Sequence, residues 1–163
     1  FGEWLRVRLA AVPLGSFERL RPDAADPAGE AKRYAELLAR DPIDVALLGI
    51  GMNGHIAFNE PGDTSFDDPR RVRVVALEEM SREQQVHEGL FASVAEVPTH
   101  AVTLTVPALL QAGTLVVTVH GKHKAAAVAD ALLGPVDPSC PASALRTHAA
   151  VSIHLDLAAA EDL

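Results

Sequence analysis

The side chains best suited to chemistry lie close together in one short stretch, residues 48–62, which reads LGIGMNGHIAFNEPG. Eight consecutive residues of this stretch contain one imidazole, two amides and one carboxylate, namely His55, Asn53, Asn59 and Glu60. An imidazole titrates near neutral pH, so His55 has the chemistry of a general acid–base group. The alternative is an ordinary Gly-rich turn that carries a structural histidine, and the spacing alone leaves both interpretations open.

A strand is expected to position this stretch. The apolar run Ile43–Leu48 is short and bounded by Pro42 and Gly49, which is typical of a buried strand in a parallel sheet. Open α/β sheets present their sites just beyond the carboxyl ends of such strands. The letters GIGMNG also fit the dinucleotide pattern GxGxxG, but no helix follows them, so we do not predict a dinucleotide site.

A second strand-to-helix turn predicts an anion site. The β-branched run Thr114–Val119 leads into HGKHK and then into the Ala-rich helix expected over Ala125–Leu133. Free N–H groups and the dipole at a helix start favour an anion, and a lysine adds a full charge. The alternative is a solvated turn. His120 and His123 lie three residues apart, but no carboxylate or thiolate lies nearby in sequence, so no metal site is predicted.

The run GIGMNGHIAFNEPG resembles the signature of the glucosamine-6-phosphate deaminases (glucosamine-6-phosphate isomerases), which form one family with the 6-phosphogluconolactonases. The lactonases share the G-x-G-x-D-G-H core and typically continue with SLFP, whereas this chain has FNEP, which indicates the deaminase branch. The family also has G-x-x-K at the second turn. Gly121 and Lys124 match it, with the lysine on the substrate phosphate.

The resemblance implies conversion of glucosamine 6-phosphate and water to fructose 6-phosphate and ammonia, without a cofactor or metal. His55 would open the sugar ring and Glu60 would orient it, while Asn53 stands where many members have Asp. Backbone N–H groups around Gly51 and Gly54 would contact sugar or phosphate oxygens. A lactonase or another sugar-phosphate isomerase is the first alternative. A non-catalytic sugar-phosphate sensor is the second.

The alternation of strands and helices predicts an α/β fold, a three-layer α/β/α sandwich with a mainly parallel, Rossmann-like sheet. We expect one domain over residues 1–163, roughly the C-terminal two thirds of the family domain. The chain starts at Phe1 rather than at Met, and the resemblance implies that the first strands and the acid that takes the C2 proton belong to a missing N-terminal part. The chain alone is therefore expected not to deaminate its substrate.

The remaining helices and strands are predicted from the spacing of apolar residues and from the Gly and Pro residues that end each segment. Trp4 is expected in the core, on the end of an amphipathic helix. Ser81 is expected to cap a polar helix, and in the resembling enzymes this region forms a mobile lid. In this chain His87 stands near the place where many of those enzymes have an arginine that binds the phosphate. The helices that contain Trp4 and Ser81 are predicted to span Phe1–Val12 and Ser81–Ala92. Further helices are predicted at Ala28–Arg40, Val106–Ala112 and Pro141–His148. Further strands are predicted at Val72–Leu77, Ala101–Thr105 and Val151–Leu155.

Composition excludes several classes of protein. A net charge of −8 and a pI near 5.3 argue against a nucleic-acid-binding face, and the 48% of apolar residues is ordinary for a globular protein. No apolar run approaches the ~20 residues that cross a bilayer. The single cysteine, Cys140, permits no internal disulfide and is interpreted as structural. We expect a cytoplasmic protein whose partner is a small-molecule substrate. Family members occur as monomers and as larger assemblies, so a homo-oligomer stays open.

Overall fold

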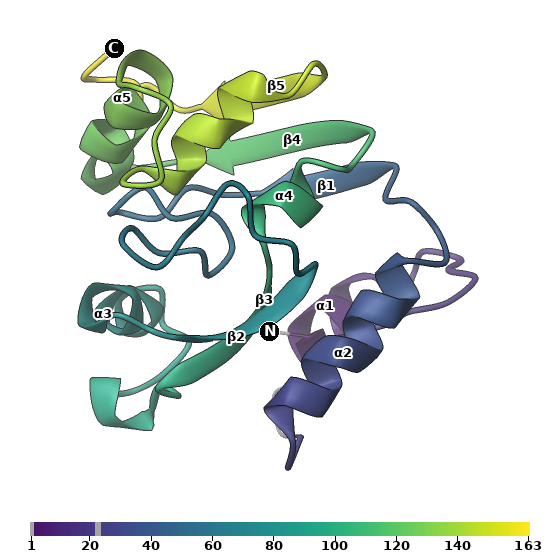
Figure 1. The fold of residues 1–163 in the computed structure, drawn as a ribbon. Helices are drawn as coiled ribbons and strands as arrows, with labels where there is room; N and C mark the ends of the chain where they lie inside the picture. Colours follow the sequence, from purple (N-terminus) through teal and green to yellow (C-terminus); the bar gives the residue numbers. More distant parts are fainter. Residues whose placement is uncertain (1, 22–23) are drawn as a thin grey trace.

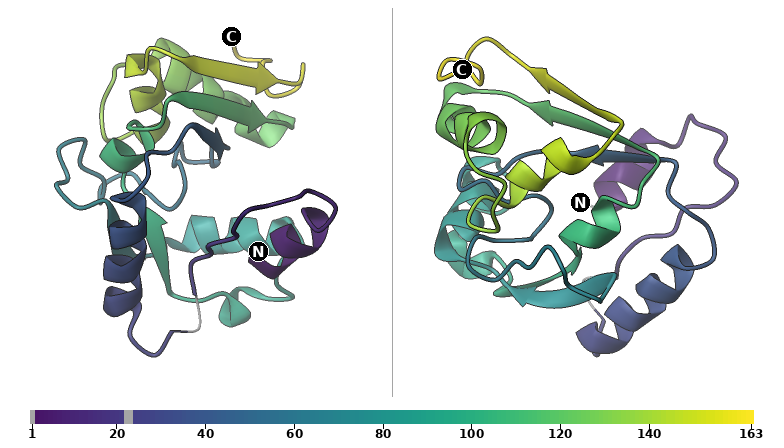
Figure 2. Two further views of the ribbon diagram at one scale, coloured as in Figure 1. Left: turned by 90° about the vertical axis from the view of Figure 1, so that its right-hand side faces the viewer. Right: turned by 45° about the horizontal axis from the view of Figure 1, so that its top comes forward.

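The computed structural model describes residues 2–21 and 24–163, so Phe1 lies outside the described residues. It contains a three-stranded parallel sheet of order β1-β4-β5 and a two-stranded antiparallel sheet, β2-β3 (Figure 1). The three parallel strands run side by side in one direction (Figure 2). The predicted α/β fold with a mainly parallel sheet is confirmed. The strands span Val45–Leu48 (β1), Val72–Ala76 (β2), His100–Leu104 (β3), Thr114–Val119 (β4) and Val151–Leu155 (β5).

Helices alternate with these strands, close to the predicted positions. The bounds of β4, β5 and α5 are those predicted, and the other predicted strands and helices shift or shorten at their ends. The α-helices span Gly2–Arg8 (α1), Pro27–Leu38 (α2), Glu79–His87 (α3), Val106–Leu109 (α4) and Ala125–Leu133 (α5), and the 3-10 helices span Val94–Glu96 (η1), Lys122–Lys124 (η2) and Pro141–Thr147 (η3).

The core lies on one face of the parallel sheet. Along β4 the side chains alternate, and Leu115, Val117 and Val119 point into the core. The side chains that cover them come mainly from α4, α5 and η3: Val106, Leu109, Ala127, Val128, Ala131, Ala142, Ala144 and Leu145. Packing on this face holds β1 and β4 in place. It therefore also sets the positions of the loops that follow their carboxyl ends.

The opposite face of the sheet is largely open. Val45 is 53% exposed and Leu47 is 78% exposed, so the prediction that β1 is buried was wrong for this face. Strands of a parallel sheet are buried on both faces only when helices cover both. Among the described residues no element covers Leu47, so two of the three expected layers are seen here.

The prediction that Trp4 lies in the core was also wrong. Trp4 is 53% exposed, and its ring carries the guanidinium of Arg8 at 4.8 Å from the ring centroid. Helix α1 ends at Arg8 and contains no buried residue. Helical spacing of apolar side chains predicts a face that can pack, but the face is buried only where a partner surface covers it. Within residues 2–21 and 24–163, no surface buries the side chains of α1.

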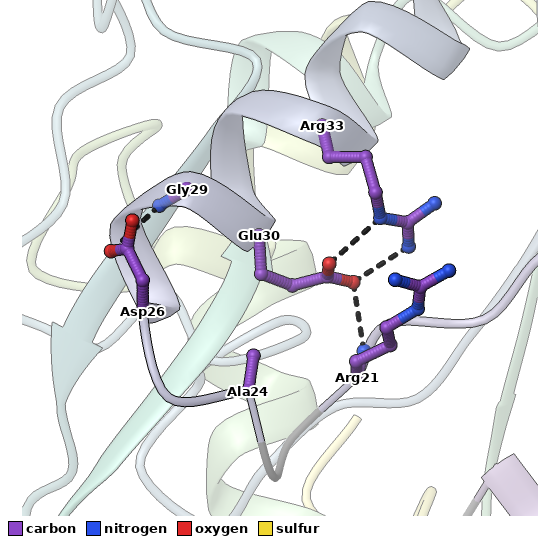
Figure 3. Close-up of a pocket in the computed structure, with 6 residues that line it drawn as sticks. All are labelled: Arg21, Ala24, Asp26, Gly29, Glu30 and Arg33. Atoms are coloured by element: carbon purple, nitrogen blue, oxygen red, sulfur yellow. Dashed lines mark hydrogen bonds and ion pairs between the residues drawn. The ribbon is translucent and has the colours of Figure 1, made fainter.

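Charged side chains fix the start of α2, at a surface hollow drawn in Figure 3. Asp26 caps the helix by accepting a hydrogen bond from the N–H of Gly29. The carboxylate of the buried Glu30 accepts bonds from Arg33 at 2.6 and 2.7 Å and from the N–H of Arg21 at 2.8 Å. The Arg33 bond is the main cause that lowers the pKa of Glu30 to about 2. These groups neutralise one another, so the hollow anchors α2 rather than offering a binding charge.

The two faces of the sheet give a matched pair of substitutions. Leu115→Ala on the covered face should lower the free energy of unfolding by about 2–5 kcal/mol, because it opens a cavity at a fully buried position. Leu47→Ala on the open face should change it by less than about 0.5 kcal/mol. Urea denaturation of the 163-residue chain measures both. Equal costs for the two variants would contradict the one-sided core.

Candidate active site

His55 lies at the centre of a buried polar cluster. The ring is 7% exposed, and its Nδ1 faces three oxygen atoms: Asn53 Oδ1 at 2.8 Å, Ser81 Oγ at 3.2 Å and Glu60 Oε2 at 3.4 Å. Among the described residues, the hydrogen bonds of the ring all involve Nδ1. Three surrounding acceptors favour a proton on Nδ1, which leaves the Nε2 lone pair of the neutral imidazole for a proton outside the cluster.

Glu60 supplies the charge of the cluster. Its side chain is 1% exposed, and its Oε2 accepts a hydrogen bond from Asn53 Nδ2 at 2.8 Å. That bond orients the Asn53 amide, because its nitrogen faces the carboxylate and its oxygen therefore faces His55. Burial raises the pKa of Glu60, but hydrogen bonds from His55, Ser81 and Asn53 outweigh it and hold the pKa below its usual range. The carboxylate is thus ionised beside the imidazole.

Two glycines let the loop close around the histidine. The His55 ring packs directly against the backbone of Gly51, in the space that a Cβ at this position would fill, and the N–H of Gly51 donates to the carbonyl of His55 at 2.8 Å. Gly54 has φ +81°, a conformation that favours glycine, and a Cβ there would meet the sulfur of Cys140. Cys140 is half-buried and burial raises the pKa of its thiol, as suits the structural role predicted for it.

The loop after β4 lies beside the first loop. Leu48 of β1 pairs with Val117 of β4 in a parallel register, so the carboxyl ends of the two strands meet at one edge of the sheet. Lys124 follows β4 and is 6% exposed, and its ammonium makes no hydrogen bond or ion pair within the described residues. Burial lowers the pKa of Lys124, and the charge of Glu88 opposes that effect. An ammonium without a hydrogen-bond or ion-pair partner, on a largely buried lysine at this edge, is suited to bind an anion.

Helix α3 connects the two loops. Gln84 Oε1 accepts a bond from the N–H of Met52 at 3.3 Å, and the His87 ring lies 5.5 Å from the ring of His123 between centroids. The prediction that Ser81 caps this helix was wrong, because the helix begins at Glu79 and Ser81 turns inward to His55. Its role in the cluster was missed, since the contact joins residues 26 positions apart and no local pattern encodes it.

The predicted site residues fall into two groups. His55, Glu60 and Asn53 form one cluster, and Lys124 lies on the neighbouring loop. The N–H groups of the three predicted glycines are already used inside the protein: Gly51 donates to His55, Gly54 to Gly51 at 3.1 Å and Gly121 to the Asp156 carboxylate at 3.1 Å. These glycines shape the loops, and their contact with substrate stays a prediction.

The second amide of the stretch is structural. Asn59 is 1% exposed, and its Nδ2 donates to the carbonyls of Ile56 and Leu104, which ties the loop to β3. Within residues 2–21 and 24–163, no three His, Cys, Asp or Glu side chains are grouped as metal ligands. Nor does any described helix have the length and apolar character needed to span a bilayer.

Comparison with known proteins places this geometry in a family. The model of the glucosamine-6-phosphate isomerases/6-phosphogluconolactonase family matches residues 3–153. The chain is 41% identical over 138 residues to a glucosamine-6-phosphate deaminase of Listeria monocytogenes serotype 4a (strain HCC23), covering 85% of this chain and 57% of that protein. A glucosamine-6-phosphate deaminase of Streptococcus uberis is 43% identical over 140 residues, covering 86% and 58%.

Solved structures agree with the sequence relatives. A monomeric glucosamine-6-phosphate deaminase of the NagB superfamily superposes with a TM-score of 0.80 at 39% identity, covering 86% of this chain and 57% of that one. The 6-phosphogluconolactonase of Trypanosoma brucei follows with a TM-score of 0.64 at 25% identity, covering 88% and 57%. The chain thus spans a little over half the length of these relatives.

The close approach of Gly51 to the His55 ring gives a direct test. Gly51→Ala should push the His55 ring out of its contacts with Asn53 and Ser81, because the new methyl needs the space of the imidazole. The ring ¹H and ¹⁵N chemical shifts of His55 should change. Gly15→Ala is the matched control, since a methyl there meets open space. Unchanged His55 shifts in Gly51→Ala would contradict the packing.

Proposed function

The chain belongs to the glucosamine-6-phosphate isomerase/6-phosphogluconolactonase family, and from this membership we propose that it carries the ring-opening and phosphate-binding parts of a glucosamine-6-phosphate deaminase. The reaction turns glucosamine 6-phosphate and water into fructose 6-phosphate and ammonia. The observation that carries the proposal is the His55 cluster, an imidazole whose Nδ1 faces the Asn53 amide and a buried carboxylate.

His55 would open the pyranose ring. The Nε2 lone pair takes the proton of the anomeric hydroxyl. The electron pair of the former O1–H bond then forms the C1=O1 carbonyl, and the C1–O5 bond breaks. The same Nε2 then gives the proton to O5, so that protons balance without a cofactor. Glu60 stabilises the transient imidazolium, and Asn53 keeps the ring oriented through its amide oxygen.

Lys124 would hold the phosphate. The ammonium of this largely buried lysine has no hydrogen-bond or ion-pair partner among the described residues, so a phosphate dianion would supply the missing anion. The position after β4 suits this role, because the neighbouring loop after β1 carries the acid–base group. Sugar and phosphate would then be bound by two loops at one edge of the sheet.

The comparisons favour the deaminase over the other candidates. Named deaminases share 41–43% identity with this chain, whereas the lactonase structures of Trypanosoma brucei and Leishmania guyanensis share 25% and 26%. A non-catalytic sensor would need the phosphate site but not an ionised carboxylate next to an imidazole. We place the activity in cytoplasmic amino-sugar catabolism. A homo-oligomer stays a prediction.

Substitution of the phosphate lysine tests the binding half of the proposal. Lys124→Ala should weaken binding of glucosamine 6-phosphate to the chain about tenfold or more, because a charge-assisted hydrogen bond is lost. Lys122→Ala is the matched control, since Lys122 is exposed and pairs with Glu161 at 2.8 Å. Isothermal titration calorimetry measures both. Equal affinities in the two variants would overturn the assignment of Lys124.

Anomer exchange tests the catalytic half without requiring deamination. The 163-residue chain should speed interconversion of the α and β anomers of glucosamine 6-phosphate, because this exchange passes through the open ring, and it should release no appreciable ammonia. His55→Ala should reduce the acceleration by about 10²–10⁴-fold, and the exposed His154→Ala should not. NMR saturation transfer measures the exchange. Acceleration that survives in His55→Ala would refute the role of His55.

A further inference from the structure

The hydroxyl of Ser81 lies inside the acid–base cluster although the residue belongs to α3. Ser81 is 1% exposed, and its Oγ is 3.2 Å from Nδ1 of His55. The hydroxyl is not used in capping, because Glu78 occupies the N-cap position, without a side-chain cap bond, and Ser81 is the third residue of the helix. A buried hydroxyl placed against a catalytic ring therefore has no role in the helix itself.

The surrounding groups define what this hydroxyl does. Glu60 Oε2 already accepts from Asn53, while Oε1 is buried without a hydrogen-bond partner among the described residues. The Ser81 hydroxyl lies 3.2 Å from His55 Nδ1 and contributes to lowering the pKa of Glu60. A serine hydroxyl can accept from Nδ1–H and donate its own proton at the same time, so Ser81 can link the imidazole to the carboxylate.

Ser81, which links the imidazole to the carboxylate, belongs to helix α3 and not to the loop that carries His55 and Glu60. The other contacts that α3 and its N-cap residue make with the same loop do not reach the His55 ring: the buried Gln84 accepts from the N–H of Met52 at 3.3 Å, and the exposed Glu78 accepts from the Asn53 amide at 3.4 Å. Glu78, the N-cap residue of α3, also brings a charge to the cluster, and its carboxylate accepts from the same Asn53 Nδ2 that donates to Glu60. Ser81 is the contact that reaches the ring.

We propose that Ser81 is a positioning residue, which completes the hydrogen bonding of the His55–Glu60 pair only while α3 is packed on the loop. The state of the acid–base pair and the packing of α3 are then coupled in both directions, as linkage requires. The inference rests on the proposed function only in taking His55 as the acid–base group. It adds that the competence of this group is set by a helix outside the signature loop.

Two readouts in the purified 163-residue chain test the proposal without substrate. Ser81→Ala should raise the pKa of Glu60, followed by ¹³C NMR of its carboxyl, because a buried carboxylate loses a donor. The same change should speed amide hydrogen exchange in α3 about fivefold, which is the effect expected for one hydrogen bond. Ser81→Cys keeps the branching of the side chain, with a larger atom that bonds only weakly, so its Glu60 titration should move as in Ser81→Ala.

Ser93→Ala is the matched control, because Ser93 is exposed and makes no side-chain cap bond, and it should leave both readouts unchanged. Faster exchange with an unmoved Glu60 titration would show a purely structural serine and overturn the proposal. A moved titration with unchanged exchange would overturn the coupling to α3. These outcomes leave sugar-phosphate binding and ring opening untouched, so failure here is distinct from failure of the proposed function.

Discussion

The burial of one carboxylate constrains the whole site. Glu60 is 1% exposed, and an ionised group this deep is costly unless donors surround it. The donors come from the amide of Asn53, the ring of His55 and the hydroxyl of Ser81. Each of them must be held in place, which requires the close approach of the ring to Gly51 and the packing of α3 on the loop. Much of the local structure follows from that one charge.

Asn53 shows how an amide serves where many relatives of this chain are expected to carry an acid. Its nitrogen donates to Glu60 and its oxygen faces His55, so it passes the orienting effect of the carboxylate to the ring. A carboxylate at this position would repel Glu60, since like charges at hydrogen-bonding distance disfavour joint ionisation. The amide therefore adds no negative charge beside the Glu60 carboxylate, which lies 3.4 Å from Nδ1 of His55.

The sequence predicted what depends on neighbouring residues. The strand Thr114–Val119, the helix Ala125–Leu133 and the cluster of His55, Asn53 and Glu60 are all encoded within short stretches, and each was located correctly. Failures occurred where the outcome depends on a distant surface. The exposure of Trp4 and Leu47 depends on what covers them, and periodicity carries no information about that. The inward turn of Ser81 depends in the same way on where α3 packs.

The site is thus divided between local and non-local parts, and the division has a mechanical consequence. The loop after β1 carries His55 and the loop after β4 leads to Lys124, on a sheet edge that the core fixes. Helix α3 reaches both loops, through Ser81 at His55 and through His87 beside His123. A ligand that shifts α3 at the loop after β4 should therefore also change the hydrogen bonding of His55. Under the proposed function, phosphate recognition and acid–base chemistry would be linked by α3, the helix for which the family resemblance implies the role of a lid.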